Sequence, residues 1–147
     1  MKKAPTKKTT LFPEEKLIIY TDGGSRGNPG PAALGAVVGS KEYGEYLGVM
    51  TNNQAEYRAL VFALKKAKQL LGKKKAKEIE VEVRMDSELV VRQMNGKYKI
   101  LEADLQPHFM EIWNLRLDFK SVAFVHVRRE ENRRADRVVN EALDAAK

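Results

Sequence analysis

Four acidic residues occur singly at the ends of expected strands and helices. The solvation of an exposed polar face does not explain acids at these positions. They are Asp22, Glu56, Asp86 and Asp136. Carboxylates that lie close together repel one another, and one of them takes up a proton unless a cation lies between them. In a chain without Cys, such hard oxygen ligands suit Mg²⁺ or Mn²⁺. A pair of these ions about 4 Å apart can activate a water molecule and stabilise the leaving oxygen of a phosphodiester.

Two of these acids have a simpler interpretation when they are taken singly. Asp86 and Asp136 lie at the beginning of expected helices, where Asp commonly caps the helix or interacts favourably with its dipole. Capping accounts for two of the acids, whereas a metal site accounts for all four. The metal site is therefore the favoured hypothesis.

A glycine-rich segment, residues 23–30, follows Asp22 directly. No Gly-Lys-Ser/Thr follows it, and it does not contain the Gly-x-Gly-x-x-Gly run that leads into a dinucleotide-binding helix, so both of those phosphate loops are excluded. An Asp before a phosphate cradle would repel the phosphate unless a metal ion intervened. We expect Gly23 and Gly24 to let the backbone approach a ligand and Asn28 to bind a sugar hydroxyl. A plain β-turn at Asn28 is compatible with this role.

The distribution of apolar residues predicts the element order β-β-β-α-β-α-α-β-α. Three strands with short links, over 17–21, 33–39 and 43–49, indicate an antiparallel meander. The later elements are a helix over 52–71, a strand over 79–85, helices over 87–94 and from 104, a strand over 121–127 and a helix from about 132. This order implies a mixed sheet with helices on its faces. If the first and fourth strands are parallel neighbours, the acids at their carboxyl ends emerge side by side.

Local patterns make three further predictions. Thr51 and Gln54 have the spacing of a capping box, with Thr51 as the N-cap. The lysine-rich residues 73–77 are expected to form a linker. The helix that Asp104 opens is expected to turn its apolar side chains inward, namely Leu105, Phe109, Ile112, Trp113 and Leu117.

The chain is basic, because 27 Lys and Arg against 20 Asp and Glu give a formal net charge of +7. This excess favours a polyanionic partner, nucleic acid before membrane, although solubility alone would explain it equally simply. The 147 residues suit one folded domain, expected over 17–147, preceded by a flexible basic arm over 1–16. No apolar run is long enough for a membrane span, and the N-terminus does not resemble a signal peptide, so we expect a cytoplasmic protein.

The residues around the four acids match the motifs of one family in order. The first motif, residues 20–31, reads Tyr-Thr-Asp-Gly-Gly-Ser-Arg-Gly-Asn-Pro-Gly-Pro and resembles the opening motif of type 1 ribonuclease H. Residues 51–56, 86–87 and 132–136 resemble the remaining motifs, and the resemblance covers roughly residues 17–146. It implies a five-stranded mixed α/β sheet in the order 3-2-1-4-5 with helices on both faces. It also implies two-metal hydrolysis of the RNA strand of RNA–DNA hybrids, without base-sequence specificity.

The resemblance also implies roles for individual residues. The catalytic residues and ligands of two Mg²⁺ or Mn²⁺ ions would be Asp22, Glu56, Asp86 and Asp136. The substrate-binding residues would be Gly23, Ser25, Asn28, Thr51, Asn52 and Asn53. The three Asn side chains would contact 2′-hydroxyls of the RNA strand, and Thr51 would contact a phosphate of the other strand.

The chain departs from the family pattern at its centre. Glu88 stands where many members carry a Gln that reaches the minor groove. Many members carry a basic, Trp-rich handle between the third and fourth acids, whereas this chain has only the short segment 95–103 there. The chain therefore resembles the handle-less branch of prokaryotic type. Our hypothesis is that the basic arm or the lysine-rich residues 73–77 supply substrate affinity instead.

A third departure concerns a mobile histidine that aids product or proton release in the family. His126 aligns with it, yet falls within an expected strand, where a structural histidine is an equal alternative. Arg129 lies closer to Asp136 in the chain and is our preferred phosphate-facing catalytic residue.

Two alternatives stay open from the sequence. One is cleavage of double-stranded RNA in addition to hybrids. The other is a non-catalytic hybrid-binding module, which would have no use for four carboxylates near phosphate. The expected partner is therefore an RNA–DNA hybrid, with double-stranded RNA as the second candidate and no membrane contact. A monomer is the default expectation.

Overall fold

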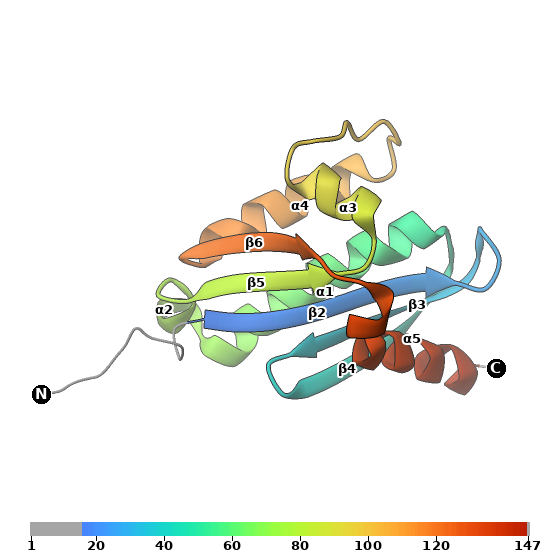
Figure 1. Cartoon of the computed structure of the whole chain (residues 1–147), viewed down its shortest axis with the longest axis horizontal. Coiled ribbons are helices and arrows are strands. Elements are labelled where there is room, and N and C mark those ends of the chain that lie inside the picture. The colour runs from blue at the N-terminus through green and yellow to red at the C-terminus, as the bar shows by residue number, and fades with distance from the viewer. Residues whose placement is uncertain (1–15, 147) are drawn as a thin grey trace, which may run out of the picture.

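A five-stranded mixed sheet forms the centre of the computed structural model, which describes residues 16–146 (Figure 1). Its strands are β2 (Lys16–Ser25), β3 (Gly30–Val38), β4 (Lys41–Met50), β5 (Glu80–Met85) and β6 (Ser121–His126). They lie in the order β4-β3-β2-β5-β6, with an antiparallel meander in β2–β4 and parallel pairing from β2 to β5 and from β5 to β6. The predicted order 3-2-1-4-5 is confirmed. The expected basic arm lies outside the described residues except for Lys16, which begins β2.

Helices cover both faces of this sheet, as predicted. They are α1 (Asn52–Leu71), α2 (Lys73–Ala76), α3 (Glu88–Met94), α4 (Gln106–Leu115) and α5 (Arg133–Ala145), with short 3₁₀ turns η2 (Arg116–Asp118) and η3 (Arg129–Glu131). Figure 1 shows α1 and α4 behind the sheet and α5 in front of β3 and β4. Within residues 16–146, no helix combines the length and apolarity needed to cross a membrane.

The main core lies between the sheet and α1 with α4. Large apolar side chains that are almost wholly buried fill it, among them Ile19, Leu60, Leu64, Val83, Met85 and Ile112. Burying one such side chain contributes about 1.5–3 kcal/mol, so this layer supplies most of the driving force for folding. A smaller cluster under α5 consists of Ala33, Val139 and Leu143.

Strand β2 is longer than predicted, and the expectation that Asp22 ends it is wrong. Residues 23–25 continue to pair with β3, with Gly23 opposite Leu34 and Ser25 opposite Ala32. Parallel pairing with β5 stops earlier, where Tyr20 meets Arg84. Glycines that favour a turn in isolation remain extended here because a neighbouring strand satisfies their backbone groups. Asp22 therefore lies just past the parallel pairing but inside the strand.

The lysine-rich linker also differs from the prediction. Its residues form the short helix α2, separated from α1 by Gly72, whose φ of +84° is a backbone conformation that favours glycine. The fully buried Ala76 anchors α2 against the core, while the lysines remain exposed.

Two expectations for α4 are wrong. The helix begins at Gln106, with Pro107 in its first turn, and Asp104 instead accepts a hydrogen bond from Gln54 at 2.7 Å. Trp113 and Leu117 do not point inward, since they are 37% and 60% exposed. Trp113 instead stacks on Phe109 with ring centroids 5.3 Å apart, so its apolar surface is partly covered on the outside of the molecule.

Helix α5 approaches the sheet so closely that only glycine fits beneath it. A Cβ atom on Gly35 would lie 2.4 Å from the carbonyl oxygen of Ala135, and one on Gly44 would lie 2.6 Å from Cγ1 of Val138. Because Asp136 is the next residue after Ala135, this contact sets the distance of its backbone from the sheet.

We expect Gly35→Ala to lower the free energy of unfolding by about 1–3 kcal/mol, because the backbone of α5 must move away from the added methyl group. Urea unfolding of the two proteins measures the change. Gly24→Ala is the matched control in a neighbouring strand, since its Cβ would meet nothing closer than 3.9 Å. Equal stability of the Gly35 and Gly24 variants would contradict this account.

Candidate active site

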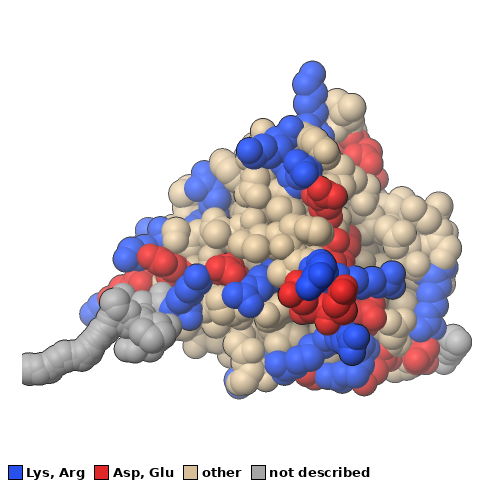
Figure 2. All heavy atoms as spheres, in the orientation of Figure 1, with Lys and Arg blue, Asp and Glu red and all other residues tan. Residues whose placement is uncertain are grey.

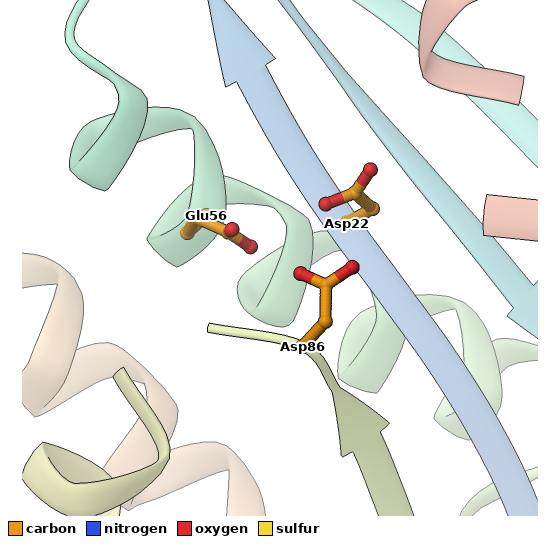
Figure 3. A group of neighbouring side chains, drawn as sticks. All are labelled: Asp22, Glu56 and Asp86. Atoms are coloured by element: carbon orange, nitrogen blue, oxygen red, sulfur yellow. The ribbon is translucent and has the colours of Figure 1, made fainter. Parts of the chain in front are cut away.

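Three carboxylates from three different elements converge above the carboxyl end of β5 (Figure 3). Asp22 comes from β2, Glu56 from the second turn of α1, and Asp86 directly follows β5. Each offers an oxygen atom, and these oxygens all lie within 4.8 Å of one another. The parallel pairing of β2 with β5 places Asp22 beside Asp86, as the sequence predicted.

Asp136 lies in the first turn of α5, close enough to Asp22 to help raise the pKa of that acid. All four acids line one open cavity of about 500 Å³, which is bordered by residues 23–26 of β2 and its following turn, by the start of α1 and by α5. Asp22 is the central acid, because it interacts with each of the other three.

Gly23 has a packing role that the sequence did not predict. A Cβ atom at this position would lie 2.3 Å from the carbonyl carbon of Ala55, inside the backbone of α1. The absent side chain therefore lets α1 pack directly on β2, and this brings Glu56 next to Asp22. Gly23 also lines the cavity, but its small size serves first the contact between helix and strand.

The burial of these acids shifts their protonation. Burial, followed by the nearby charges of Asp86 and Asp136, raises the pKa of Asp22 to about 8. Burial and the charges of Asp22 and Asp86 likewise raise the pKa of Glu56 well above its ordinary value. Hydrogen bonding from the Gly23 backbone opposes both shifts but does not overcome them. Without a cation the cluster therefore retains protons at neutral pH.

The donor set fits a hard divalent cation. Oε1 of Glu56 is buried and has no hydrogen-bond partner within residues 16–146, so a carboxylate oxygen is left unsatisfied next to two other acids. A buried polar atom of this kind is costly unless a ligand satisfies it. The acids offer only oxygen atoms as potential ligands, and oxygen ligands suit Mg²⁺ or Mn²⁺.

Asn132 belongs to the site, although sequence reasoning placed it only at the start of the last helix. It is 1% exposed, and its Nδ2 donates to the carbonyl oxygen of Thr21 at 2.9 Å and to Oδ2 of Asp86 at 3.4 Å. Its side chain does not cap α5. Asn132 thus ties the beginning of α5 to β2 and to Asp86. An Asn four residues before Asp136 was the available indication, but it could not be distinguished from an N-cap.

The predicted substrate residues Ser25, Asn28 and Asn52 form one hydrogen-bonded network. Oδ1 of Asn52 accepts from the backbone N–H of Ser25 at 2.8 Å and from its hydroxyl at 3.0 Å. Oδ1 of Asn28 accepts from the backbone N–H of Asn52 at 3.0 Å. These bonds join the turn after β2 to the N-terminus of α1. The side-chain oxygens of Asn28 and Asn52 therefore accept hydrogen bonds from the protein, and their NH₂ groups take no part in these contacts.

Thr51 is the N-cap of α1, and the predicted capping box is confirmed. Its hydroxyl accepts from the backbone N–H of Gln54 at 3.1 Å, while Oε1 of Gln54 accepts from the backbone N–H of Thr51 at 2.9 Å. Thr51 and Asn53 also line a neighbouring cavity of about 230 Å³, together with Glu102 and Asp104. Of these four, only Asn53 also borders the cavity that holds the acids.

The structure separates the two candidates for the additional catalytic residue. Arg129, in η3, lines the cavity with the carboxylates. His126 ends β6, is exposed, and is not among the residues that line this cavity. Its position near Glu88 lowers the pKa of that acid, although the ion pair of Glu88 with Arg92 at 2.7 Å has the larger effect.

Comparison with known proteins agrees with this geometry. Residues 20–142 match the family model described as reverse transcriptase-like. The chain is 48% identical to LC11-RNase H1, whose crystal structure holds an RNA/DNA hybrid, and the two superpose with a TM-score of 0.83 over 88% of this chain and 98% of that one. The chain belongs to the type 1 ribonuclease H family.

Two further ribonuclease H relatives come from other organisms. RNase H1 of the archaeon Halobacterium salinarum is 40% identical, with a TM-score of 0.81 over 88% of this chain and 98% of that structure. A bifunctional protein of Mycobacterium tuberculosis is 41% identical in an alignment of 138 residues that covers 89% of this chain. The chain spans only 36% of the length of that mycobacterial relative.

The shifted pKa of Asp22 makes the stability of this ribonuclease H domain depend on pH and on metal. The folded protein holds a proton up to about pH 8 that the unfolded chain releases near 3.8, so metal-free stability falls as pH rises between these values. We expect Asp22→Asn to raise the metal-free Tm by a few degrees at pH 8, and by less at pH 5. We also expect Mg²⁺ to raise the wild-type Tm more at pH 8 than at pH 6.

Thermal unfolding in EDTA and in Mg²⁺, across this pH range, measures both effects. Glu88→Gln is the control, because this acid is exposed and pairs with Arg92 outside the cluster. If the metal-free Tm of Asp22→Asn followed pH with the same slope as the wild type, the raised pKa would be refuted.

Proposed function

We propose that this chain is an endonuclease that hydrolyses the RNA strand of RNA–DNA hybrids with two divalent metal ions and without base-sequence specificity. The observation that carries the proposal is the convergence of Asp22, Glu56 and Asp86 within 4.8 Å, with Asp136 in the same cavity. Membership of the ribonuclease H family supports it, as does the 48% identity to a relative whose structure contains an RNA/DNA hybrid.

The four acids act by holding the cations, which are proposed to be Mg²⁺ or Mn²⁺. When bound, such ions activate a water molecule and stabilise the leaving oxygen of the phosphodiester. Asp22 is the acid best placed to bind both ions, because it interacts with the other three acids. Asn132, which is itself buried, would orient Asp86 through its hydrogen bond to Oδ2 of that acid.

Recognition of the RNA strand is assigned to the network at the start of α1. Because the amide oxygens of Asn28 and Asn52 accept bonds from the protein, their NH₂ groups are the ones that would donate to 2′-hydroxyls. Gly23, Ser25 and Asn53 would contact the same strand. Thr51, at the N-terminus of α1, would contact a phosphate of the other strand. Contacts of this kind read sugar and phosphate, which explains why no base specificity is proposed.

The proposed unit is a monomer, since one chain supplies all four acids and the substrate network. The surface around the site carries both signs of charge. Figure 2 shows basic side chains interspersed with acidic ones on the face where β6 leads into α5. Among the basic residues on this path, Arg129 is proposed to face a substrate phosphate.

The central test is cleavage of a hybrid labelled on its RNA strand, with Mg²⁺, with Mn²⁺ and in EDTA. We expect metal-dependent loss of the RNA strand, and a rate at least about 100-fold lower for Asp22→Asn because a ligand of the ions is removed. Matched double-stranded RNA and DNA are run beside the hybrid. Cleavage of double-stranded RNA would extend the substrate range, whereas tight hybrid binding without cleavage under either metal would indicate a binding module.

A second prediction concerns Arg129. We expect Arg129→Ala to lower turnover of the hybrid by roughly tenfold, because a charge-assisted contact to phosphate is lost, and His126→Ala to have a smaller effect. Steady-state kinetics of the two variants measure the difference. Arg133→Ala, an exposed arginine that does not line the cavity, controls for the loss of positive charge. An unchanged rate for Arg129→Ala would defeat the assignment.

A further inference from the structure

Arg26 is a second arginine beside the acids to which the proposed mechanism assigns no role. It lies in the turn between β2 and β3 and lines the same cavity as the four carboxylates. Arg26 and Arg129 are the two arginines that line this cavity within residues 16–146, and they come from different elements. Its side chain is 38% exposed and therefore accessible to a ligand.

The backbone of Arg26 is held in place from two sides. Its N–H donates to the carbonyl oxygen of Pro31 at 2.8 Å, which closes the turn. The preceding residue, Ser25, is bound to Asn52 through both its backbone and its hydroxyl. The turn that carries Arg26 is thus attached to the start of α1, the element proposed to contact the RNA strand.

The guanidinium of Arg26 is oriented by α5. Nη1 lies 2.8 Å from Oδ1 of Asp144, and Nη2 donates to Oδ1 of Asn140 at 3.2 Å. Asp136, Asn140 and Asp144 are spaced four residues apart, so they lie in a row on one face of α5. Arg26 therefore lies along the same face as the fourth acid, one to two turns farther from the metal site.

A purely structural role explains this arrangement poorly. The side chain of Asp144 is 64% exposed, and ion pairs as exposed as this contribute little to stability. Helix α5 is already held by its close contacts with Gly35 and Gly44. The contacts do, however, hold a planar cation in a fixed orientation at the border of a cavity that contains four carboxylates.

A guanidinium in this position suits a phosphate. Its planar N–H groups match the oxygens of a phosphodiester in two parallel hydrogen bonds, and Asp144 and Asn140 use only part of them within the described residues. A substrate strand that crosses the acids carries further phosphates on both sides of the one that reacts. A cation beside the cavity compensates the repulsion between such a phosphate and the cluster.

We propose that Arg26 binds a backbone phosphate of the RNA strand that is adjacent to the scissile phosphate. Asn140 and Asp144 are positioning residues, which orient the guanidinium before substrate arrives. The inference rests on the proposed function, because it takes the RNA strand as the ligand of this cavity.

The test compares four substitutions by the affinity and the salt dependence of hybrid binding. Binding of a labelled hybrid is measured in the Asp22→Asn background, with Mg²⁺, at several salt concentrations. We expect Arg26→Gln to weaken binding roughly tenfold and to reduce the slope of log Kd against log salt by about 0.7–0.9, the value for one phosphate contact. Arg26→Lys keeps the slope but recovers only part of the affinity, since a point charge cannot make the paired bonds.

Asp144→Asn separates phosphate binding from a structural role, because it removes the ion pair but keeps the guanidinium. We expect it to weaken hybrid binding by about threefold at most, less than Arg26→Gln, and to keep the salt slope, because the guanidinium loses part of its orientation but keeps its charge. Arg134→Ala is the matched control, since this arginine of α5 pairs with Glu42 at 2.8 Å and does not line the cavity. Thermal unfolding and Mg²⁺ binding are expected to be the same in all four variants.

Either of two results would overturn the proposal while leaving the nuclease intact. One is an unchanged affinity and salt slope for Arg26→Gln in a protein whose parent cleaves hybrid. The other is an equal loss of affinity in Arg26→Gln and Asp144→Asn, accompanied by weaker Mg²⁺ binding, which would make Arg26 a structural support of α5. A parent protein that neither binds nor cleaves hybrid would overturn the proposed function as well.

Discussion

The repulsion between carboxylates that share a poorly solvated space is the constraint on which the rest of this structure depends. Asp22 and Glu56 are each only 8% exposed, and Asp86 and Asp136 lie beside them. The cost of this arrangement appears as raised pKa values for Asp22 and Glu56. No local preference would place these side chains together. The fold must hold them there, and a bound divalent cation would turn the repulsion into attraction.

Two close contacts of backbone with backbone hold the acids in place. Gly23 lets α1 pack on β2, and Gly35 lets α5 pack on β3, in both cases at distances that no side chain would permit. Asn132 adds a buried hydrogen bond from the start of α5 to β2. These contacts are rigid because they involve main chain and leave no room for rearrangement. The geometry of the acids is therefore set by the packing of the elements.

The surroundings of the acids divide into a rigid side and an accessible side. On the rigid side, Ser25, Asn28 and Asn52 bind one another and join β2 to α1. On the accessible side, Arg26 and Arg129 border the same cavity with partly exposed side chains. A polyanionic strand needs both features, since its sugars require fixed donors and its phosphates require cations. Residues 95–105, by contrast, form only a short connection between α3 and α4.

The sequence by itself determined the element order, the sheet order through the family resemblance, the capping box at Thr51 and the identity of the four acids. Periodicity and motif spacing are local properties, so they are visible without the fold. Only the tertiary structure decided that Asp22 lies within β2, that Gly23 serves α1, and that Trp113 faces outward. It also decided that Asn132 and Arg26 belong to the site. These features depend on which segments, distant in the sequence, come into contact in the fold. At such contacts, strand pairing and close packing override the local preferences that the sequence shows.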